Sequence, residues 1–277
     1  MKQWRIFLTV AAVMGAATIQ SPAEAVAGIQ YVTSTSATDS SAAKTVVLYC
    51  PTGTVSIGGG AYLTGALGQA TIRQITPTTV LGRNALVVIG AEDSNGYSGT
   101  WHITVTNVCI PTPAGFRYVR VTVSDPSLVW ATAECAGQRI IGSGYTVSAT
   151  AKAMATGIEI DVRNRAYLSV ESSNVPGAVT PITGTVTAVC AGSGLPGMVQ
   201  TSASTPQDSS NPQTVTVTCP AGTQIIHVGG DLWRVRGHSV IDDFRIIRPN
   251  MVAVTGYEDE LGNPDVWAAE AYATCAT

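Results

Sequence analysis

Three glutamates recur at equivalent places in this 277-residue chain, 17 to 19 positions before a cysteine. They are Glu92, Glu171 and Glu258. An aspartate follows in two of the three places, as Asp93 and Asp259, and tyrosines lie nearby, as Tyr97 and Tyr257. Carboxylates accept hydrogen bonds from sugar hydroxyls, and aromatic faces pack against the C–H edges of sugars. These seven residues are therefore the predicted ligand-binding residues of a shallow carbohydrate site.

The same acidic segments have two other interpretations. Residues 93–96 and 258–263 offer oxygen ligands for calcium, although neither segment has the EF-hand pattern. Acidic residues are also common at hairpin tips, where they favour solubility. Trp101 and Trp267, each eight positions before a cysteine, are then expected to pack in the core. The sequence leaves all three interpretations open and predicts no other cofactor.

A catalytic site has weaker support. The chain has three histidines, and none lies in an H-E-x-x-H motif; a G-x-S-x-G motif is also absent. The richest polar stretch lies near the C-terminal end and has no counterpart earlier in the chain. It consists of His227, Asp231, His238, Asp242 and Asp243. A set of carboxylates and histidines is able to bind metal or to perform acid–base chemistry, so a hydrolase is one hypothesis.

Internal repetition is the strongest pattern in the sequence. Three segments, 26–110, 111–191 and 192–277, each contain a glycine, a strand ending in cysteine, a turn, a glycine cluster and a closing strand with a second cysteine. The spacing from Gly28 to Cys50 equals that from Gly197 to Cys219, at 22 positions. Three copies of one unit predict that each copy has the same topology.

The six cysteines divide evenly between the three repeats, and an even number suggests disulfides in an exported protein. If the two cysteines of each repeat occupy equivalent places, the bridges are Cys50–Cys109, Cys135–Cys190 and Cys219–Cys275. The alternative joins neighbouring repeats through Cys109–Cys135 and Cys190–Cys219, which leaves Cys50 to pair with Cys275. The absence of C-x-x-C pairs argues against a zinc site.

Alternation of apolar and polar residues predicts that strands position all of these side chains. Clear examples are segments 85–91, 101–108, 185–189 and 214–218, separated by Gly, Pro, Asn or Asp. The expected fold is therefore all-β, with three repeats in a pseudo-threefold, β-prism-like assembly around a shared core. Three small tandem β-sandwiches are the alternative.

The N-terminal segment predicts export. Residues 1–25 have a basic start, a short apolar run and the small-residue site Ala23-Glu24-Ala25, which together are typical of a signal peptide. No later run reaches the length of a membrane span, and the C-terminus offers no anchor, so we expect a released extracellular protein, with the periplasm as the alternative. The net charge of −3 and the scarcity of lysine argue against nucleic acid as a partner. Oligomeric state is not determined by the sequence.

The order C-P-x-G, glycine cluster, acidic residue, Trp and a strand ending in Cys-Ala resembles secreted actinobacterial repeat proteins of uncharacterised role. The segments 187–191 and 272–276 match this pattern best, whereas Cys109 is followed by Ile110. The arrangement is also distantly similar to vitelline membrane outer layer protein, whose copies are shorter. That similarity implies a threefold β-prism, and neither family supplies catalytic residues.

These observations rank three functional hypotheses. The first is a secreted, non-enzymatic protein that binds carbohydrate or cell-surface components. The second is a structural component of an extracellular or envelope layer. The third is a hydrolase with a site in the third repeat.

Overall fold

A computed structural model describes residues 28–66, 68–93, 96–148, 153–161, 163–172, 181–235 and 237–277. The expected signal peptide, residues 1–25, lies outside these ranges. The described residues form strands and no helix. The strands are β1 (Gln30–Thr35), β2 (Ala43–Tyr49), β3 (Thr54–Thr64), β4 (Ala70–Val80), β5 (Arg83–Glu92), β6 (His102–Pro111), β7 (Arg117–Asp125), β8 (Leu128–Glu134), β9 (Arg139–Val147), β10 (Ala153–Ile160), β11 (Arg165–Ser172), β12 (Ile182–Ala191), β13 (Val199–Ser204), β14 (Gln213–Thr218), β15 (Gln224–Trp233), β16 (Ser239–Arg248), β17 (Met251–Glu258) and β18 (Ala268–Ala276).

Each repeat contributes six strands, and these strands form two three-stranded half-sheets. In the first repeat one half-sheet has the order β1-β6-β3 and the other has the order β2-β5-β4. The same division holds for β7 to β12 and for β13 to β18. All of the pairings are antiparallel, so neighbouring strands of a half-sheet are joined without long crossover connections.

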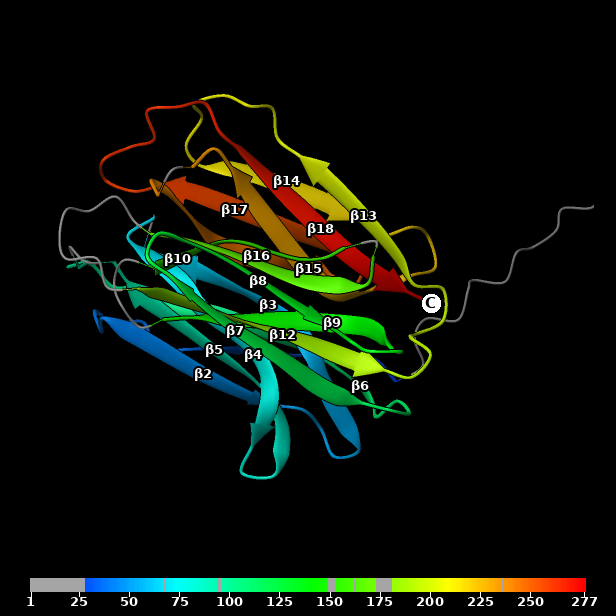
Figure 1. Ribbon diagram of the computed structural model, residues 1–277. Helices are drawn as coiled ribbons and strands as arrows, with labels where there is room; N and C mark the ends of the chain where they lie inside the picture. The colour runs from blue at the N-terminus through cyan, green and yellow to red at the C-terminus, as the bar shows by residue number, and fades with distance from the viewer. Residues whose placement is uncertain are drawn as a thin grey trace, which may run out of the picture.

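The repeats are joined because the third strand of each one pairs with the fourth strand of another. The three junctions are β3 with β16, β15 with β10, and β9 with β4. They produce three six-stranded sheets, here named sheet I (β1-β6-β3-β16-β17-β14), sheet II (β13-β18-β15-β10-β11-β8) and sheet III (β2-β5-β4-β9-β12-β7). Every sheet is shared by two repeats, and the three sheets close into a ring. The all-β, three-repeat, β-prism-like assembly is thus confirmed, with a sandwich-like pair of half-sheets inside each repeat. In Figure 1 the third repeat (yellow to red) lies above the second (green), and the first (blue to cyan) lies below.

Each junction between repeats is short. It covers only two register pairs, such as Asp243 with Tyr62 and Phe244 with Ala61 in sheet I. Both strands of the junction carry a β-bulge: the one in β16, between Ile241 and Asp243, directly adjoins the junction pairs, and the one in β3, between Ser56 and Gly58, lies further along the strand. The corresponding strands of sheets II and III are bulged at the same places. Because a bulge bends its strand, the two half-sheets diverge on either side of the junction.

The glycine clusters of the sequence lie at these junctions. A Cβ atom at Gly60 of β3 would lie 2.1 Å from the carbonyl oxygen of Phe244 in β16. Equivalent distances at Gly144 and Gly229 are 2.2 and 2.4 Å, again to a backbone oxygen of the partner strand. Only glycine allows the backbones to approach this closely, which explains why each repeat has a glycine cluster in its third strand.

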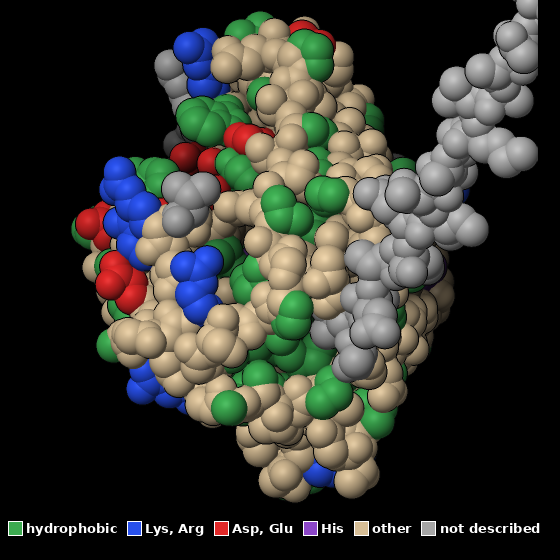
Figure 2. Space-filling model, turned by 90° about the vertical axis from the view of Figure 1, so that its right-hand side faces the viewer, with side chains coloured by type: hydrophobic (Ala, Val, Ile, Leu, Met, Phe, Trp, Pro, Cys, Tyr) green, Lys and Arg blue, Asp and Glu red, His purple; other side chains and the backbone are tan. Residues whose placement is uncertain are grey.

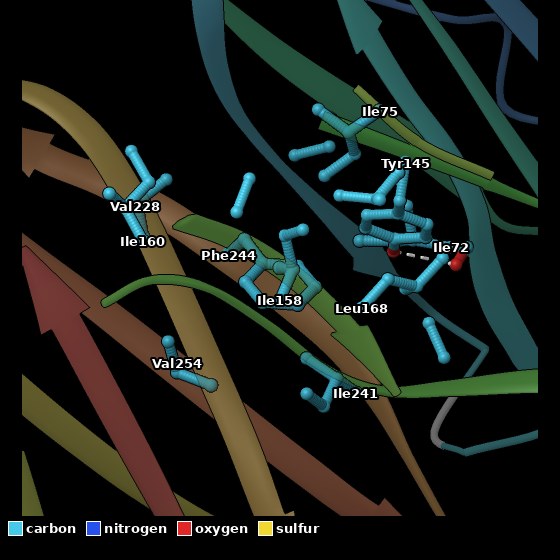
Figure 3. Close-up of a cluster of buried hydrophobic side chains, with 14 of the residues drawn as sticks. Ile72, Ile75, Tyr145, Ile158, Ile160, Leu168, Val228, Ile241, Phe244 and Val254 are labelled. Atoms are coloured by element: carbon cyan, nitrogen blue, oxygen red, sulfur yellow. Dashed lines mark hydrogen bonds between the residues drawn. The ribbon is translucent and has the colours of Figure 1, made fainter. Parts of the chain in front are cut away.

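One hydrophobic core is shared by all three repeats. Its members include Ile72 of the first repeat, Tyr145 and Leu168 of the second, and Phe244 and Val254 of the third. Figure 3 shows these side chains converging between the sheets, with the Tyr145 hydroxyl donating a hydrogen bond of 2.8 Å to the Ile72 carbonyl oxygen. A shared core means that the repeats are not independent sandwiches.

A second hydrophobic cluster occupies one end of the ring. The bulge residues Ile57, Ile141 and Ile226, one from each repeat, are buried there. The partly buried side chains of Phe116 and Met198 pack against this cluster. Figure 2 shows the end of the molecule that carries the C-terminus, where hydrophobic side chains run through the middle of the face and charged side chains gather mainly toward one side.

The disulfides are Cys50–Cys109, Cys135–Cys190 and Cys219–Cys275, which is the within-repeat pattern predicted from the sequence. Each first cysteine directly follows the second strand of its repeat, and each second cysteine lies in the sixth strand. A bridge therefore links the two half-sheets of one repeat. Three disulfides are typical of extracellular or secreted proteins. Within the described ranges there is no helix with the length and hydropathy needed to cross a membrane.

Candidate functional site

The recurring glutamates contact the recurring tryptophans. Glu92 Oε1 accepts a hydrogen bond of 3.0 Å from Trp101 Nε1, and Glu92 Oε2 accepts one of 3.0 Å from the Tyr97 backbone amide. In the third repeat Glu258 Oε1 accepts a hydrogen bond of 2.8 Å from Trp267 Nε1. Both indole rings are fully buried. The two carboxylates therefore satisfy buried donors, which is a structural role.

The other predicted ligand-binding residues are dispersed over the molecule. Glu171 Oε2 accepts a hydrogen bond of 3.0 Å from the Gly237 amide of the third repeat, and Asp259 Oδ2 lies 3.3 Å from His238 Nδ1. Asp93 Oδ1 accepts a hydrogen bond of 3.2 Å from the Gly96 amide. Tyr257 lies in a groove, which is described below. Within the described ranges no group of three or more His, Cys, Asp or Glu side chains is arranged to hold a metal ion.

Truncating Glu258 to alanine tests the structural role of the repeated glutamates. The change leaves the buried Trp267 Nε1 donor without its acceptor, so we expect a loss of about 1–3 kcal/mol in the free energy of unfolding. Urea denaturation measures this loss. The control is Glu260→Ala, because Glu260 is an exposed acid two residues away. Equal stability of the two variants would show that the glutamate–tryptophan bond contributes nothing.

Three equivalent grooves lie on the faces of the sheets that point away from the core, one at each junction between repeats. Their volumes are about 270 Å³ in sheet I, 300 Å³ in sheet II and 450 Å³ in sheet III. In sheet I the groove residues Tyr62 and Asp243 alternate along their strands with the core residues Ala61 and Phe244. The divergence of the half-sheets at the bulges accounts for the hollow at each junction.

A row of six residues in cross-strand register passes through each groove, and we call it the central row. In sheet II it is Ser204, Glu270, Asp231, Gly157, Ser169 and Trp130. In sheet I it is Thr35, Thr104, Tyr62, Asp243, Thr255 and Thr214. In sheet III it is Thr122, Thr185, Thr146, Gln74, Ile89 and Thr45. The pseudo-threefold symmetry thus produces three equivalent grooves whose side chains differ in type.

Sheet II carries the most acidic groove. Asp231 and Glu270 lie directly opposite each other on β15 and β18, so their side chains share one face of the sheet. On the other side of Asp231 the row has Gly157, where an added Cβ would lie 2.4 Å from Asp231 Oδ1. The missing side chain at Gly157 therefore provides the space that the Asp231 carboxylate occupies.

A third carboxylate reaches the same groove from the next row. Glu159 of β10 and Tyr272 of β18 lie in the row that passes through Gly229, which has no side chain between them. The Tyr272 hydroxyl is within hydrogen-bonding reach of both the Glu159 and the Glu270 carboxylates. The acidic groups of two repeats are thereby brought together in one groove.

Exposed aromatic rings flank these carboxylates. Trp130 of β8 lines the groove with 61% of its surface exposed, and Tyr167 lines it beside Trp130. Trp130 stands three strands from Asp231 along the central row, which is about 14 Å. On the other side Trp233 is 49% exposed, and its Nε1 donates a hydrogen bond of 3.1 Å to Glu270 Oε2. The result is a wide, shallow surface with aromatic faces and carboxylate acceptors.

The electrostatics of the groove follow from burial and from like charges. Burial, together with smaller effects of the nearby Glu159, Glu270 and Glu171 charges, raises the pKa of Asp231 to about 7. Burial also raises the pKa of Glu159, with Asp161 and Glu270 adding to the effect. At neutral pH Asp231 is therefore present in both protonation states and is able to donate or to accept a hydrogen bond.

The other two grooves differ in charge. The sheet III groove is lined by Arg73, Gln74 and threonines and has no carboxylate among its described lining residues. The sheet I groove has two aspartates, Asp242 and Asp243, together with Arg245. Aromatic rings with large exposed area flank only the sheet II groove among these three.

The polar stretch of the third repeat is divided by the fold. His227 lies at the place that Gly58 and Gly142 occupy in the other repeats, where its Nε2 is 2.6 Å from Ser143 Oγ. Burial lowers the pKa of the His227 imidazole to about 3, so it is a neutral interior residue. Asp231 lies in the sheet II groove, whereas Asp242 and Asp243 lie in the sheet I groove. The five residues therefore form no common site.

Sequence reasoning identified Asp231 but missed its partners in the sheet II groove. Trp130 and Glu159 lie in the second repeat, and Glu270 lies in the third, so no local spacing connects them. One signal was available for Trp130. It occupies a polar position of an alternating strand, and its counterparts in the other repeats are Thr45 and Thr214.

Comparison with known proteins provides no relative from which a function is transferable. No protein-family model matches the chain, and no curated protein matches it in sequence.

Proposed function

We propose that this protein is secreted and binds glycans, and that the sheet II groove holds the sugar. The single observation that carries this proposal is that the exposed Trp130 ring lines the same groove as the carboxylates of Asp231 and Glu159. Pyranose rings have apolar C–H faces and a rim of hydroxyl donors. An aromatic face with adjacent carboxylate acceptors complements both features.

The pseudo-threefold repeats support the assignment of Trp130 to binding. The fold needs no tryptophan at this place, because threonine occupies it in sheets I and III. An indole that is 61% exposed contributes little hydrophobic burial to the folded state, so its large apolar face is available to a ligand. Its place at the lip of a groove with three carboxylates makes it a suitable stacking platform.

Secretion is part of the proposal. The three disulfides, the predicted signal peptide of residues 1–25 and the small net charge of −3 all fit an extracellular protein. A shallow groove on a sheet face also suits a long glycan chain, which is able to pass across the sheet without a deep pocket.

Trp130→Ala is the direct test of glycan binding. The wild-type protein is screened on a glycan array, and the Kd of the best ligand is then measured for both proteins by calorimetry. We expect Trp130→Ala to weaken binding about tenfold or more, as is usual for a central aromatic anchor. The matched control is Thr45→Ala at the equivalent place in sheet III, which should leave the Kd unchanged. Absence of glycan binding by the wild type, or equal Kd values for Trp130→Ala and the wild type, would contradict the proposal.

The same groove favours one second candidate, a glycoside hydrolase. Asp231 has a pKa raised to about 7 by burial and lies directly opposite Glu270, which is an arrangement that suits a general acid and its partner carboxylate. Release of reducing sugar from the array ligand by the wild type, and its loss in Asp231→Asn with the Kd kept, would favour this candidate. Binding without release supports the non-enzymatic function.

A further inference from the structure

The sheet I groove contains a buried acceptor that the protein leaves without a partner. The Asp243 side chain is only 9% exposed, and its Oδ2 receives Arg245 Nη2 at 3.0 Å and the Thr255 hydroxyl at 3.2 Å. Its Oδ1 is buried and has no hydrogen-bond partner among the described residues. Buried carboxylate oxygens are nearly always hydrogen-bonded, so this atom indicates a missing donor.

A second carboxylate lies beside it. Asp242 is the extra residue of the β16 bulge, and the bulge brings the side chains of Asp242 and Asp243 to the same groove. Asp242 is 3% exposed and receives a hydrogen bond from the Gly68 backbone amide. Arg245 is the cation of this groove, and its guanidinium lies 4.8 Å from the centre of the Tyr62 ring. Burial and the charge of Asp243 raise the pKa of Asp242 well above its usual range, so a cationic ligand that offsets these costs favours the ionised form of both carboxyl groups.

The groove also has the shape and the surface for a small polar molecule. Its volume is about 270 Å³, and it is lined by the rings of Tyr62 and Tyr257 and by the hydroxyls of Thr64 and Thr214. The described residues offer no third acidic, histidine or cysteine ligand there, so a bare metal ion lacks the donor set it needs. An organic cation with hydroxyl groups is able to interact with the carboxylates, the tyrosine rings and the threonine hydroxyls of this groove.

We infer that the sheet I groove is a second binding site, which takes a small hydroxylated amine of the amino-sugar type. The ammonium group donates to Asp243 Oδ1 and is attracted by both carboxylates. The tyrosine rings pack against the ligand ring and interact with its charge, and the threonine hydroxyls bond to its hydroxyls. The inference is independent of the sheet II groove, because it rests on residues of a different sheet.

The other two sheets show that the acid pair is specific to this groove. The places equivalent to Asp242 and Asp243 are Arg73 and Gln74 in sheet III. In sheet II they are Thr156 and Gly157. Sheet III therefore presents a cation where sheet I presents an anion, and it is not expected to take an amine.

Glucosamine and glucose are the matched probes, because glucosamine has an ammonium group where glucose has a hydroxyl group. They are titrated at pH 7.5, with a chelator present, into Trp130→Ala, which weakens any contribution of the sheet II groove. We expect glucosamine to bind at least tenfold more tightly than glucose. Asp243→Asn in the same background should weaken glucosamine binding at least tenfold, while Asp125→Asn, at the end of β7 in sheet III, should not change it. Binding should also weaken at pH 5, because the pKa of Asp243, raised by burial to about 6, predicts its protonation there.

The outcomes separate this site from the sheet II groove. Tyr257→Ala removes a partly exposed ring of the sheet I groove and serves as the second variant if Asp243→Asn does not fold; it too should weaken glucosamine. Absence of glucosamine binding, equal affinity for the two sugars, or unchanged affinity in the sheet I variants would overturn the inference. Asp243→Asn and Tyr257→Ala change residues of the sheet I groove alone, so their effect on glucosamine binding in the Trp130→Ala background is decisive whether or not the sheet II groove binds glycans.

Discussion

Replacing Gly60 with alanine is expected to lower the free energy of unfolding by about 3 kcal/mol or more. The added Cβ would lie 2.1 Å from the Phe244 carbonyl oxygen, and this atom belongs to the backbone of the strand that joins the third repeat to the first. The junction has only two register pairs, so a backbone shift large enough to relieve the clash separates the two half-sheets. The loss is therefore expected to affect the whole sheet rather than one side chain.

Urea denaturation followed by circular dichroism measures this effect. The control is Gly192→Ala, because Gly192 lies in a connection where the nearest atom to an added Cβ, the Ala114 carbonyl oxygen, is 3.2 Å away. Gly144→Ala and Gly229→Ala should behave like Gly60→Ala, since their junctions have the same geometry. A Gly60→Ala protein as stable as the Gly192→Ala control would mean that the junctions do not hold the ring together.

The second large effect is a pH-dependent gain of stability in Asp231→Asn. The folded-state pKa of Asp231 is raised to about 7, mainly by burial, whereas an unfolded aspartate titrates near pH 4. The folded state therefore holds this proton more tightly than the unfolded state. The contribution of this bound proton to the free energy of unfolding is fully present below about pH 4 and is lost as the pH rises to about 7. Above pH 7 the wild type carries a partly buried carboxylate whose ionisation opposes folding by about 4 kcal/mol.

Asparagine has the same shape and carries no charge, and its side-chain oxygen is able to keep the hydrogen bond from the Leu232 amide. We thus expect Asp231→Asn to be about 2–3 kcal/mol more stable than the wild type at pH 8 and nearly equal to it at pH 4. Unfolding curves at the two pH values test this difference. Asp125→Asn is the control, since the pKa of Asp125 is lowered, not raised, by backbone hydrogen bonds from Ser127 and Leu128. A gain for Asp231→Asn of equal size at both pH values would contradict the electrostatic explanation.

The unfavourable free energy of ionising Asp231 in the folded state also affects the proposed binding of glycans. Burial and the charge of Glu270 raise the pKa values of Asp231 and Glu159, so a ligand that donates hydrogen bonds to these two carboxylates stabilises their ionised forms. Glycan binding in this groove is therefore expected to increase the stability of the protein most strongly at alkaline pH, where the unliganded groove has its highest charge.

Several features of the fold were predictable from local pattern. Period-two alternation predicts strands because successive side chains point to opposite faces, as in segments 85–91 and 214–218. The recurrence of cysteines predicts within-repeat disulfides, because equivalent units place equivalent residues together. Glu92 and Glu258 were recognised as equivalent for the same reason. Their contact with Trp101 and Trp267 was not predicted, since the alternation does not show which carboxylate faces which indole.

The sequence by itself determined that this protein is an all-β molecule of three repeats, each with two cysteines and an equivalent glutamate. Those features depend on short-range periodicity and on symmetry. Only the tertiary structure decided that the third strand of each repeat pairs with the fourth strand of another. This pairing spans two register pairs and depends on packing at the shared core, so no local pattern encodes it. It places Trp130 and Glu159 of the second repeat on the same sheet face as Asp231 and Glu270 of the third, and it creates the groove in which we propose that glycans bind.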